Sequence, residues 1–158
     1  LDGDQALECL NLLSRSCVKN NFYTTHNDWR SMGIGLEMEW APFQIDANMG
    51  LSATIHQMMM NSRTGHISIL PALPSKWRKG SIQGLMARGK ISVSIWWDLD
   101  GKGLIEVEMS SIGKAQEIAV LLPVGDERRV IVQLEADVPK KLSIETKASS
   151  QKPVVEMT

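Results

Sequence analysis

The run Ile91-Ser-Val-Ser-Ile-Trp-Trp97, followed by Asp98-Leu-Asp-Gly101, decides the fold of this 158-residue chain. Its apolar residues alternate with serines and one tryptophan, which is the period of a strand with one buried face. The Asp-Gly pair that follows is typical of a tight hairpin turn. The sequence therefore predicts an antiparallel hairpin here. Neighbours on one strand face opposite sides of a sheet, so one of Trp96 and Trp97 is expected in the core and the other at the surface or a domain interface.

The same two-residue period continues along the rest of the chain, interrupted by turn-forming glycines and prolines. The predicted strands are 66–70, 82–87, 104–110, 117–122, 129–134 and 141–146. The last residues, 147–158, are expected to form a loose tail or an edge strand. Short strands at regular spacing are typical of an antiparallel sandwich. We therefore predict a C-terminal antiparallel β-sandwich domain over residues 66–158.

Before Gly65 the apolar period is that of a helix. Asp2 or Asp4 can cap a first helix, and a second helix is predicted over residues 48–62, with Gly65 as its C-terminal stop. Two helices and a loop cannot bury both of their faces alone. The chain is therefore predicted to be α+β, with an N-terminal helical hairpin over residues 1–65 that needs further partners.

Composition and charge exclude several classes of function. The formal net charge is −1 and Lys and Arg are dispersed, so we expect no nucleic-acid partner. The sequence has no apolar run of about 18 residues, so no membrane span is expected. The two cysteines, eight residues apart on a predicted helix, are too distant for a disulfide, and no Cys/His cluster has zinc spacing, so neither metal nor cofactor is expected. The chain starts at Leu1 without a signal segment and is expected to be a piece of a longer protein.

The stretch Trp40-Ala-Pro-Phe-Gln-Ile-Asp-Ala-Asn-Met-Gly50 holds the main candidate for chemistry. It places Asp46 where a buried turn is expected to meet the start of the second helix. Free backbone N–H groups and the helix dipole favour a negative charge there. An N-cap is the commoner explanation for a carboxylate at such a position, and a catalytic carboxylate is the alternative. The surrounding sequence favours the alternative.

Three ordered blocks resemble glycoside hydrolase family 95, the inverting α-L-fucosidases. The family's Phe-Gln-Ile-Asp-Gly-Asn-Phe-Gly corresponds to residues 43–50, its Leu-Leu-Pro-Ala-Leu-Pro-x-x-Trp to residues 69–77, and its Gly-Ser-Val-x-Gly-Leu-x-Ala-Arg-Gly to residues 80–89. Order and spacing agree in all three. Two positions depart from the family, because Ala47 replaces its glycine and Met49 its phenylalanine.

The resemblance implies both a fold and a role for Asp46. Residues 1–65 would be the end of a catalytic (α/α)6 barrel, and residues 66–158 the C-terminal β-sandwich. Asp46 would polarise an asparagine that orients the attacking water, while that asparagine and the general-acid glutamate both lie upstream of this chain. An inverting glycosidase needs two groups roughly 6.5–9.5 Å apart. The parent is therefore expected to cleave α-L-fucosides or α-L-galactosides, and this fragment alone to be inactive.

Three further residues are candidates for contacts with a sugar. Trp40 offers a ring that could stack on a sugar face, although tryptophan is equally an ordinary packing residue. Asn48 belongs to the motif. His26 lies in the polar loop Thr24-Thr-His-Asn-Asp28, where it could touch a hydroxyl or be only solvated.

The expected partner is a fucosylated glycan, and the resemblance favours an extracellular or periplasmic location. Self-association is expected through exposed helical faces, centred on Leu7, Leu10, Leu51 and Ile55. Two alternatives remain open. The chain could be a non-catalytic β-sandwich used for packing or carbohydrate binding, or a homologue whose altered turn no longer carries chemistry.

Overall fold

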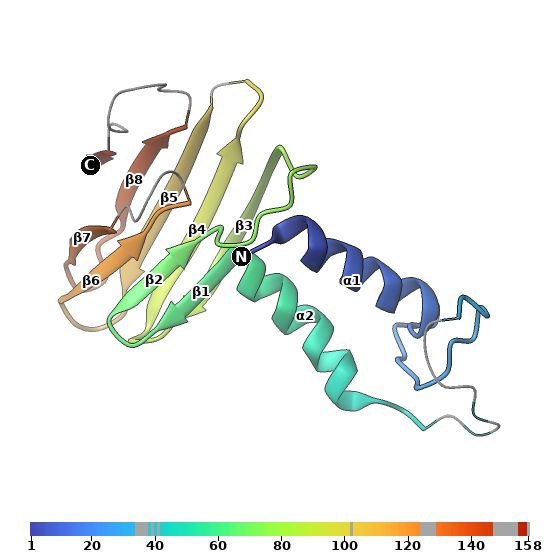
Figure 1. Cartoon of the computed structure of the whole chain (residues 1–158). Helices are drawn as coiled ribbons and strands as arrows, with labels where there is room; N and C mark the ends of the chain where they lie inside the picture. The colour runs from blue at the N-terminus through green and yellow to red at the C-terminus, as the bar shows by residue number, and fades with distance from the viewer. Residues whose placement is uncertain are drawn as a thin grey trace.

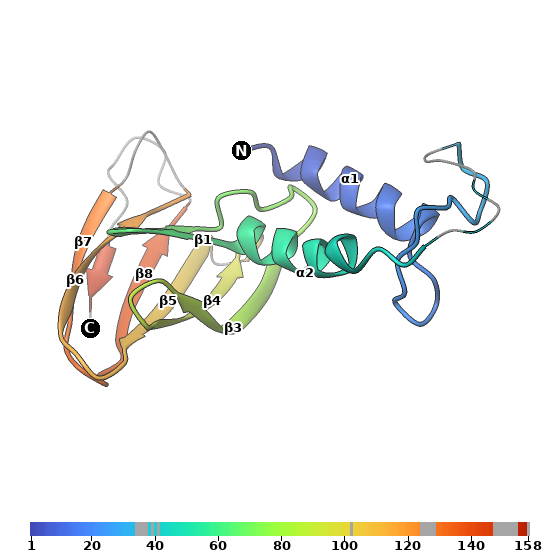
Figure 2. The same ribbon diagram turned by 90° about the horizontal axis from the view of Figure 1, so that it is seen from below.

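The structure is a computed structural model that describes residues 1–33, 38, 40, 42–101, 103–123, 129–146 and, by backbone alone, 155–157. Within these residues the chain forms two helices and then nine strands. Figure 1 shows the strands gathered into a two-layer sandwich, with both helices projecting from one end of it. The same arrangement is visible from below in Figure 2. The predicted α+β fold, a helical pair followed by a β-sandwich, is confirmed.

The first helix, α1 (Gly3–Ser16), begins where the sequence predicts. Asp2 is its N-cap, and the Asp2 carboxylate accepts a hydrogen bond of 3.0 Å from the backbone N–H of Gln5. Asp4 has a different role, because its carboxylate accepts from the backbone N–H of Ser75 at 2.7 Å and from its hydroxyl at 3.0 Å. The start of α1 is thereby joined to the loop that precedes the third strand.

The second helix, α2 (Ile45–Met59), differs from its predicted limits of 48–62 at both ends. It ends at Met59 because the next residues pair with another strand, so that tertiary pairing overrides the local helical pattern. Strand β1 (Met60–Arg63) forms an antiparallel hairpin with β2 (His66–Ile69). Gly65, with a φ of +81°, is in the turn of this hairpin and is not a helix stop.

The strands form two sheets. In the four-stranded sheet the order is β1-β2-β6-β7, where β6 is Gln116–Leu121 and β7 is Arg129–Leu134, and β2 pairs with β6 in parallel. In the five-stranded sheet all pairs are antiparallel. Its order is β3 (Lys79–Ala87), β4 (Ile91–Asp98), β5 (Leu104–Ser111), β8 (Lys140–Glu145) and β9 (Val155–Met157). Of the two predictions for the C-terminal residues, a loose tail or an edge strand, the edge strand is present as β9.

The core lies between the two sheets and reaches the base of the helices. On β4 the predicted alternation is confirmed, since residues 91, 93, 95 and 97 are buried and the intervening ones are only half-buried. Met58, Met59 and Met60 carry this core to the end of α2, where flexible thioether side chains fill the space between helix and sheets. The division into units at residue 65 stays a prediction, and the sheet itself begins at Met60.

Candidate functional site

The residues singled out by the sequence lie at the end of the helices that points away from the sandwich (Figure 1). Gln44 is the N-cap of α2 and makes no side-chain capping bond. The carbonyl of Gln44 accepts a hydrogen bond of 2.9 Å from the backbone N–H of Asn48, so the helix begins before Asp46. The N-cap interpretation of Asp46 is wrong, because Asp46 is an exposed residue within the first turn.

A loop between the helices is fastened to the start of α2. Thr25 pairs with Phe43 in an isolated antiparallel bridge, and the backbone N–H of Gln44 donates to the carbonyl of Thr24 at 2.9 Å. The ring of Tyr23 stacks on that of Phe43, with centroids 4.2 Å apart and planes inclined by 25°. This contact region, residues 23–25 against 43–44, is called the clasp below. It fixes the position of the motif's first residues relative to the loop that carries His26.

Asn48 takes part in the same arrangement through its side chain. Its Oδ1 accepts a hydrogen bond of 2.9 Å from the hydroxyl of Thr24, which is 1% exposed. A buried hydroxyl needs such a partner, because leaving it unsatisfied would cost about 1–3 kcal/mol. The side-chain nitrogen of Asn48 has no partner among the described residues and can donate to a ligand.

The remaining candidates are exposed. Trp40 is 84% exposed, and within the part of the chain that the structure describes no side-chain hydrogen bond or ion pair is found for Trp40, His26 or Asp46. The structure therefore brings the segment around His26 to the start of α2 by way of the clasp. Among the described residues, no hydrogen bond or ion pair joins the side chain of His26 or Trp40 to that of Asp46.

The two departures from the family pattern are both tolerated by this helix start. Ala47 is the third residue of α2 and is not among the described residues with positive φ, so a side chain there causes no backbone strain. Alanine also has the highest helix propensity. Met49 is 63% exposed. Both residues are compatible with a helix start that carries Asp46 in its first turn.

Thr24 and Tyr23 were not singled out by the sequence. The hydrogen bond from Thr24 to Asn48 spans 24 residues, and no local pattern announces a contact over that separation. Composition gives no signal either, because the buried residues of this loop are polar types that sequence alone assigns to solvent. They are Thr24, Thr25 and Asp28.

The exposed apolar side chains of the helical part are not the ones that the sequence predicts. Leu7 and Leu10 are half-buried against the core, and Leu51 and Ile55 are also half-buried, so these four are not the most exposed apolar side chains. At the far end of the helices the large exposed ones include Phe22, Trp40, Ile45 and Met49, which are 76%, 84%, 59% and 63% exposed.

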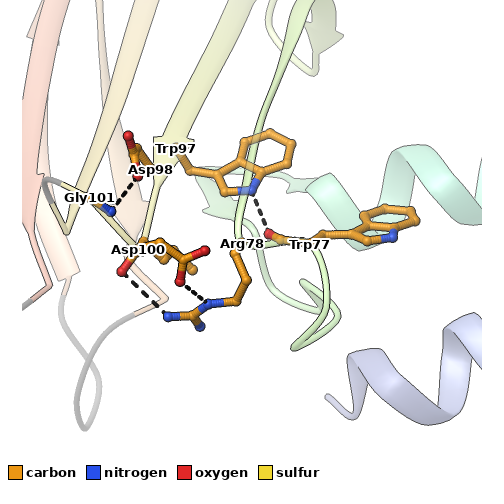
Figure 3. A network of polar contacts seen from close by, with 7 residues as sticks. Trp77, Arg78, Trp97, Asp98, Asp100 and Gly101 are labelled. Carbon is orange, nitrogen blue, oxygen red and sulfur yellow. Dashed lines mark hydrogen bonds and ion pairs between the residues drawn. The ribbon is translucent and has the colours of Figure 1, made fainter.

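A second polar cluster, at the end of the sandwich nearest the helices, is structural (Figure 3). Trp97 donates its indole N–H to the carbonyl of Trp77 at 2.7 Å, and Arg78 forms an ion pair of 2.9 Å with Asp100. The carboxylate of Asp98 accepts from the backbone N–H of Gly101 at 2.8 Å and from Lys79 at 3.2 Å. The Gly101 hydrogen bond and then the Lys79 ammonium hold the pKa of Asp98 below its usual value of 3.8.

Within the described residues, no group of three or more His, Cys, Asp or Glu side chains could hold a metal ion. None of the helices that the structure describes is long and apolar enough to cross a membrane.

Comparison with known proteins then gives the family. The family model described as "Glycoside hydrolase family 95, C-terminal domain" matches residues 61–153. This chain belongs to glycoside hydrolase family 95. The match covers β1 except its first residue, Met60, and most of the sandwich, in agreement with the resemblance found in residues 69–77 and 80–89.

Relatives of this family 95 chain carry fucosidase names. "Alpha-L-fucosidase 2" of Arabidopsis thaliana is 51% identical over 57 residues, which are 35% of this chain and 7% of that protein. "Probable alpha-fucosidase A" of Aspergillus niger is 37% identical over 71 residues, 38% of this chain and 9% of that protein. The protein of the same name from Aspergillus oryzae is 38% identical over 69 residues, 37% of this chain and 10% of that protein. The matched segment thus spans a tenth or less of each relative.

Proposed function

We propose that this chain is the C-terminal part of a glycosidase that cleaves α-L-fucosides, or the related α-L-galactosides, with inversion. The observation that carries the proposal is the exposed carboxylate of Asp46 in the first turn of α2, beside the clasp. The fucosidase names of relatives up to 51% identical support the substrate class.

This chain supplies only one of the groups that the proposed reaction needs. In the proposed mechanism the Asp46 carboxylate accepts a hydrogen bond from the amide of an asparagine supplied by another part of the parent. That bond makes the asparagine carbonyl a better acceptor for a proton of the attacking water. A general acid on the opposite face of the sugar, roughly 6.5–9.5 Å away, protonates the leaving oxygen.

Substrate contacts are proposed for three residues near the same helix start. The side-chain nitrogen of Asn48 is placed to donate to a sugar hydroxyl, because its Oδ1 is already held by Thr24. The ring of Trp40 is open for stacking on the C–H face of a sugar. His26 stands next to Thr25 in the clasp and would contact a hydroxyl of the same glycan.

The isolated chain is proposed to be inactive, because one carboxylate without its acid and its water-orienting amide provides no complete set of groups. General acid–base catalysis contributes typically about 10²–10⁴-fold. Aryl α-L-fucoside hydrolysis by the isolated chain at a rate clearly above buffer would contradict this part of the proposal.

The experiment that tests the role of Asp46 is steady-state kinetics on the parent protein. Asp46→Asn keeps the shape of the side chain and removes its charge, so we expect kcat to fall by about 10²–10⁴-fold with little change in KM. The matched control is Glu8→Gln, which removes an exposed carboxylate from α1 and should leave kcat unchanged. A purely structural Asp46 predicts near-normal turnover and a loss of only about 0.3–1 kcal/mol in stability, measured by thermal melting.

A further inference from the structure

A row of side chains crosses the outer face of the five-stranded sheet. The register pairs Ser81 with Trp96, Trp96 with Glu106, and Glu106 with Ser143, so the four lie side by side on β3, β4, β5 and β8. They face away from the core because their neighbours along each strand are directed toward it. Neighbouring strands lie about 4.8 Å apart, so the row extends over roughly 14 Å.

Trp96 differs from the adjacent Trp97 in both its ring and its N–H group. Trp97 is 7% exposed, and its indole N–H is satisfied by the carbonyl of Trp77. Trp96 is only half-buried, and its indole N–H has no hydrogen-bond partner among the described residues. A buried tryptophan N–H usually finds a partner. Trp96 therefore presents an aromatic surface and an unused donor to whatever lies on this face.

The side chains around Trp96 leave space beside its ring. Ser81 and Ser143 are too short to cover it, and two hollows share Trp96 and Glu106 in their lining. One, of about 430 Å³, extends toward Lys79 and Asp98, and the other, of about 190 Å³, toward Glu108 and Lys141. The larger falls in the range of roughly 300–1,000 Å³ that is usual for small-molecule sites.

The charges on this face select the kind of ligand. Lys79 pairs with Asp98 at 3.2 Å, and Lys141 with Glu108 at 3.5 Å. Glu106 is exposed and has no ionic partner in the described part of the chain. An uncompensated carboxylate disfavours an anion. A quaternary ammonium group is typically held by a cage of several aromatic rings. Trp96 lines both hollows, and Trp97, which also lines the larger one, is only 7% exposed and belongs to the core, so this face offers one open ring and no cage.

A neutral sugar chain matches all of these features. The C–H face of a pyranose is apolar and packs on an aromatic ring, while its hydroxyls donate charge-assisted hydrogen bonds to a carboxylate. A polypeptide partner would instead have to bury Glu106, which is costly without a cation to pair with it. We propose that the outer face of β3, β4, β5 and β8 binds a neutral oligosaccharide, with one ring on Trp96 and hydroxyls on Glu106, Ser81 and Ser143. The proposal goes beyond catalysis by Asp46 and does not depend on it.

The direct test is a two-dimensional ¹⁵N–¹H NMR titration of the 158-residue chain with L-fucose, D-galactose and galactotriose. The chain has five tryptophans, so five indole N–H signals report on five places at once. We expect the Trp96 indole and the backbone amides of Glu106 and Ser143 to shift saturably, with the trisaccharide bound more tightly than either monosaccharide. The Trp97 indole should stay in place, because its hydrogen bond to Trp77 is internal.

Variants of the same chain complete the test. Trp96→Ala should weaken binding by about tenfold or more, and Glu106→Gln by several-fold. The matched control is Met86→Ala, which truncates a large side chain, 59% exposed, on the same sheet opposite Ser92. That variant should bind as the unaltered chain does. Melting curves verify that each variant folds. If Trp96→Ala does not fold, the binding measured for Glu106→Gln tests the proposal in its place.

Three results would overturn the proposal. The first is the absence of any saturable shift with all three sugars at millimolar concentration. The second is a set of shifts centred on Trp40 in place of Trp96. The third is a Trp96 indole signal that changes with protein concentration alone, which would show a second copy of the chain on this face. None of these bears on the kinetics of Asp46→Asn in the parent, so the two proposals fail separately.

Discussion

The sandwich and the far end of the helices differ in how much of their large apolar side chains is exposed. On β4, Ile91, Val93 and Ile95 have no exposed surface, whereas Trp40 and Met49 near the start of α2 are 84% and 63% exposed. The sandwich closes a core within this chain. The helical end presents large exposed apolar side chains near the clasp, and such side chains mark an interaction site where they form a patch. Stability is therefore concentrated in one region and the proposed chemistry in the other.

Truncating one isoleucine in each region should give the largest difference between the two regions in the free energy of unfolding. Ile95→Ala, at a position with no exposed surface, is expected to lower the free energy of unfolding by about 2–5 kcal/mol, through lost burial and a residual cavity. Ile45→Ala, where the side chain is 59% exposed, should change it by less than about 0.5 kcal/mol. Urea unfolding measures both. Equal losses would show that the helical end is packed as firmly as the sandwich.

The exposed side chains at the helical end should also cause self-association, which the sandwich should not. We expect the isolated chain to form dimers or larger assemblies through residues 1–62, because the exposed apolar side chains at the far end of the helices have no cover within it. Replacing Trp40 and Met49 together by serine should weaken association by about tenfold or more, as measured by sedimentation. The control is Met86→Ser on β3, which should not change it. A monomer at high concentration would contradict this expectation.

The smallest expected effect is the contribution of the Asp98 carboxylate, at the end of β4, to the melting temperature. Its folded-state pKa is held below 3.8 by Gly101 and Lys79, so its ionised form stabilises the fold. That contribution is fully present above the unfolded-state pKa and is lost as the pH falls through the lower folded-state value. Asp98→Asn should therefore lower the melting temperature slightly at pH 7, and the difference should vanish in strong acid. A difference that is the same at both pH values would assign the effect to shape and not to charge.

Most of the sandwich could be predicted from the sequence because its signal is local. Alternation along β4 and the turn after it fix which residues face the core, and every strand predicted after Gly65 is present within a few residues. Strand β1 could not be predicted, because Met60 continues a methionine run that fits the preceding helix. Its identity as a strand depends on pairing with Ile69 across the hairpin. The parallel pairing of β2 with β6 is likewise a property of the assembled sheet.

The site was predicted only in part for a similar reason. The motif marked Asp46 and Asn48, since both belong to one short run of sequence. The start of α2 lies three residues before the predicted one, because the hydrogen bond between Gln44 and Asn48 that begins the helix leaves no trace in composition. The clasp joins residues about 20 apart, and side-chain pairing over such a distance follows from the folded chain and not from periodicity.

In the proposed function, the start of α2 is one part of a catalytic centre completed by residues from elsewhere in the parent protein. A crystal structure of the parent with a bound fucose analogue tests it most directly. We expect a carboxylate oxygen of Asp46 to lie about 2.7–3.2 Å from the side-chain amide nitrogen of an asparagine outside this chain. That asparagine should hold a water beside the anomeric carbon. An Asp46 carboxylate facing bulk solvent, with the sugar bound elsewhere, would contradict the account.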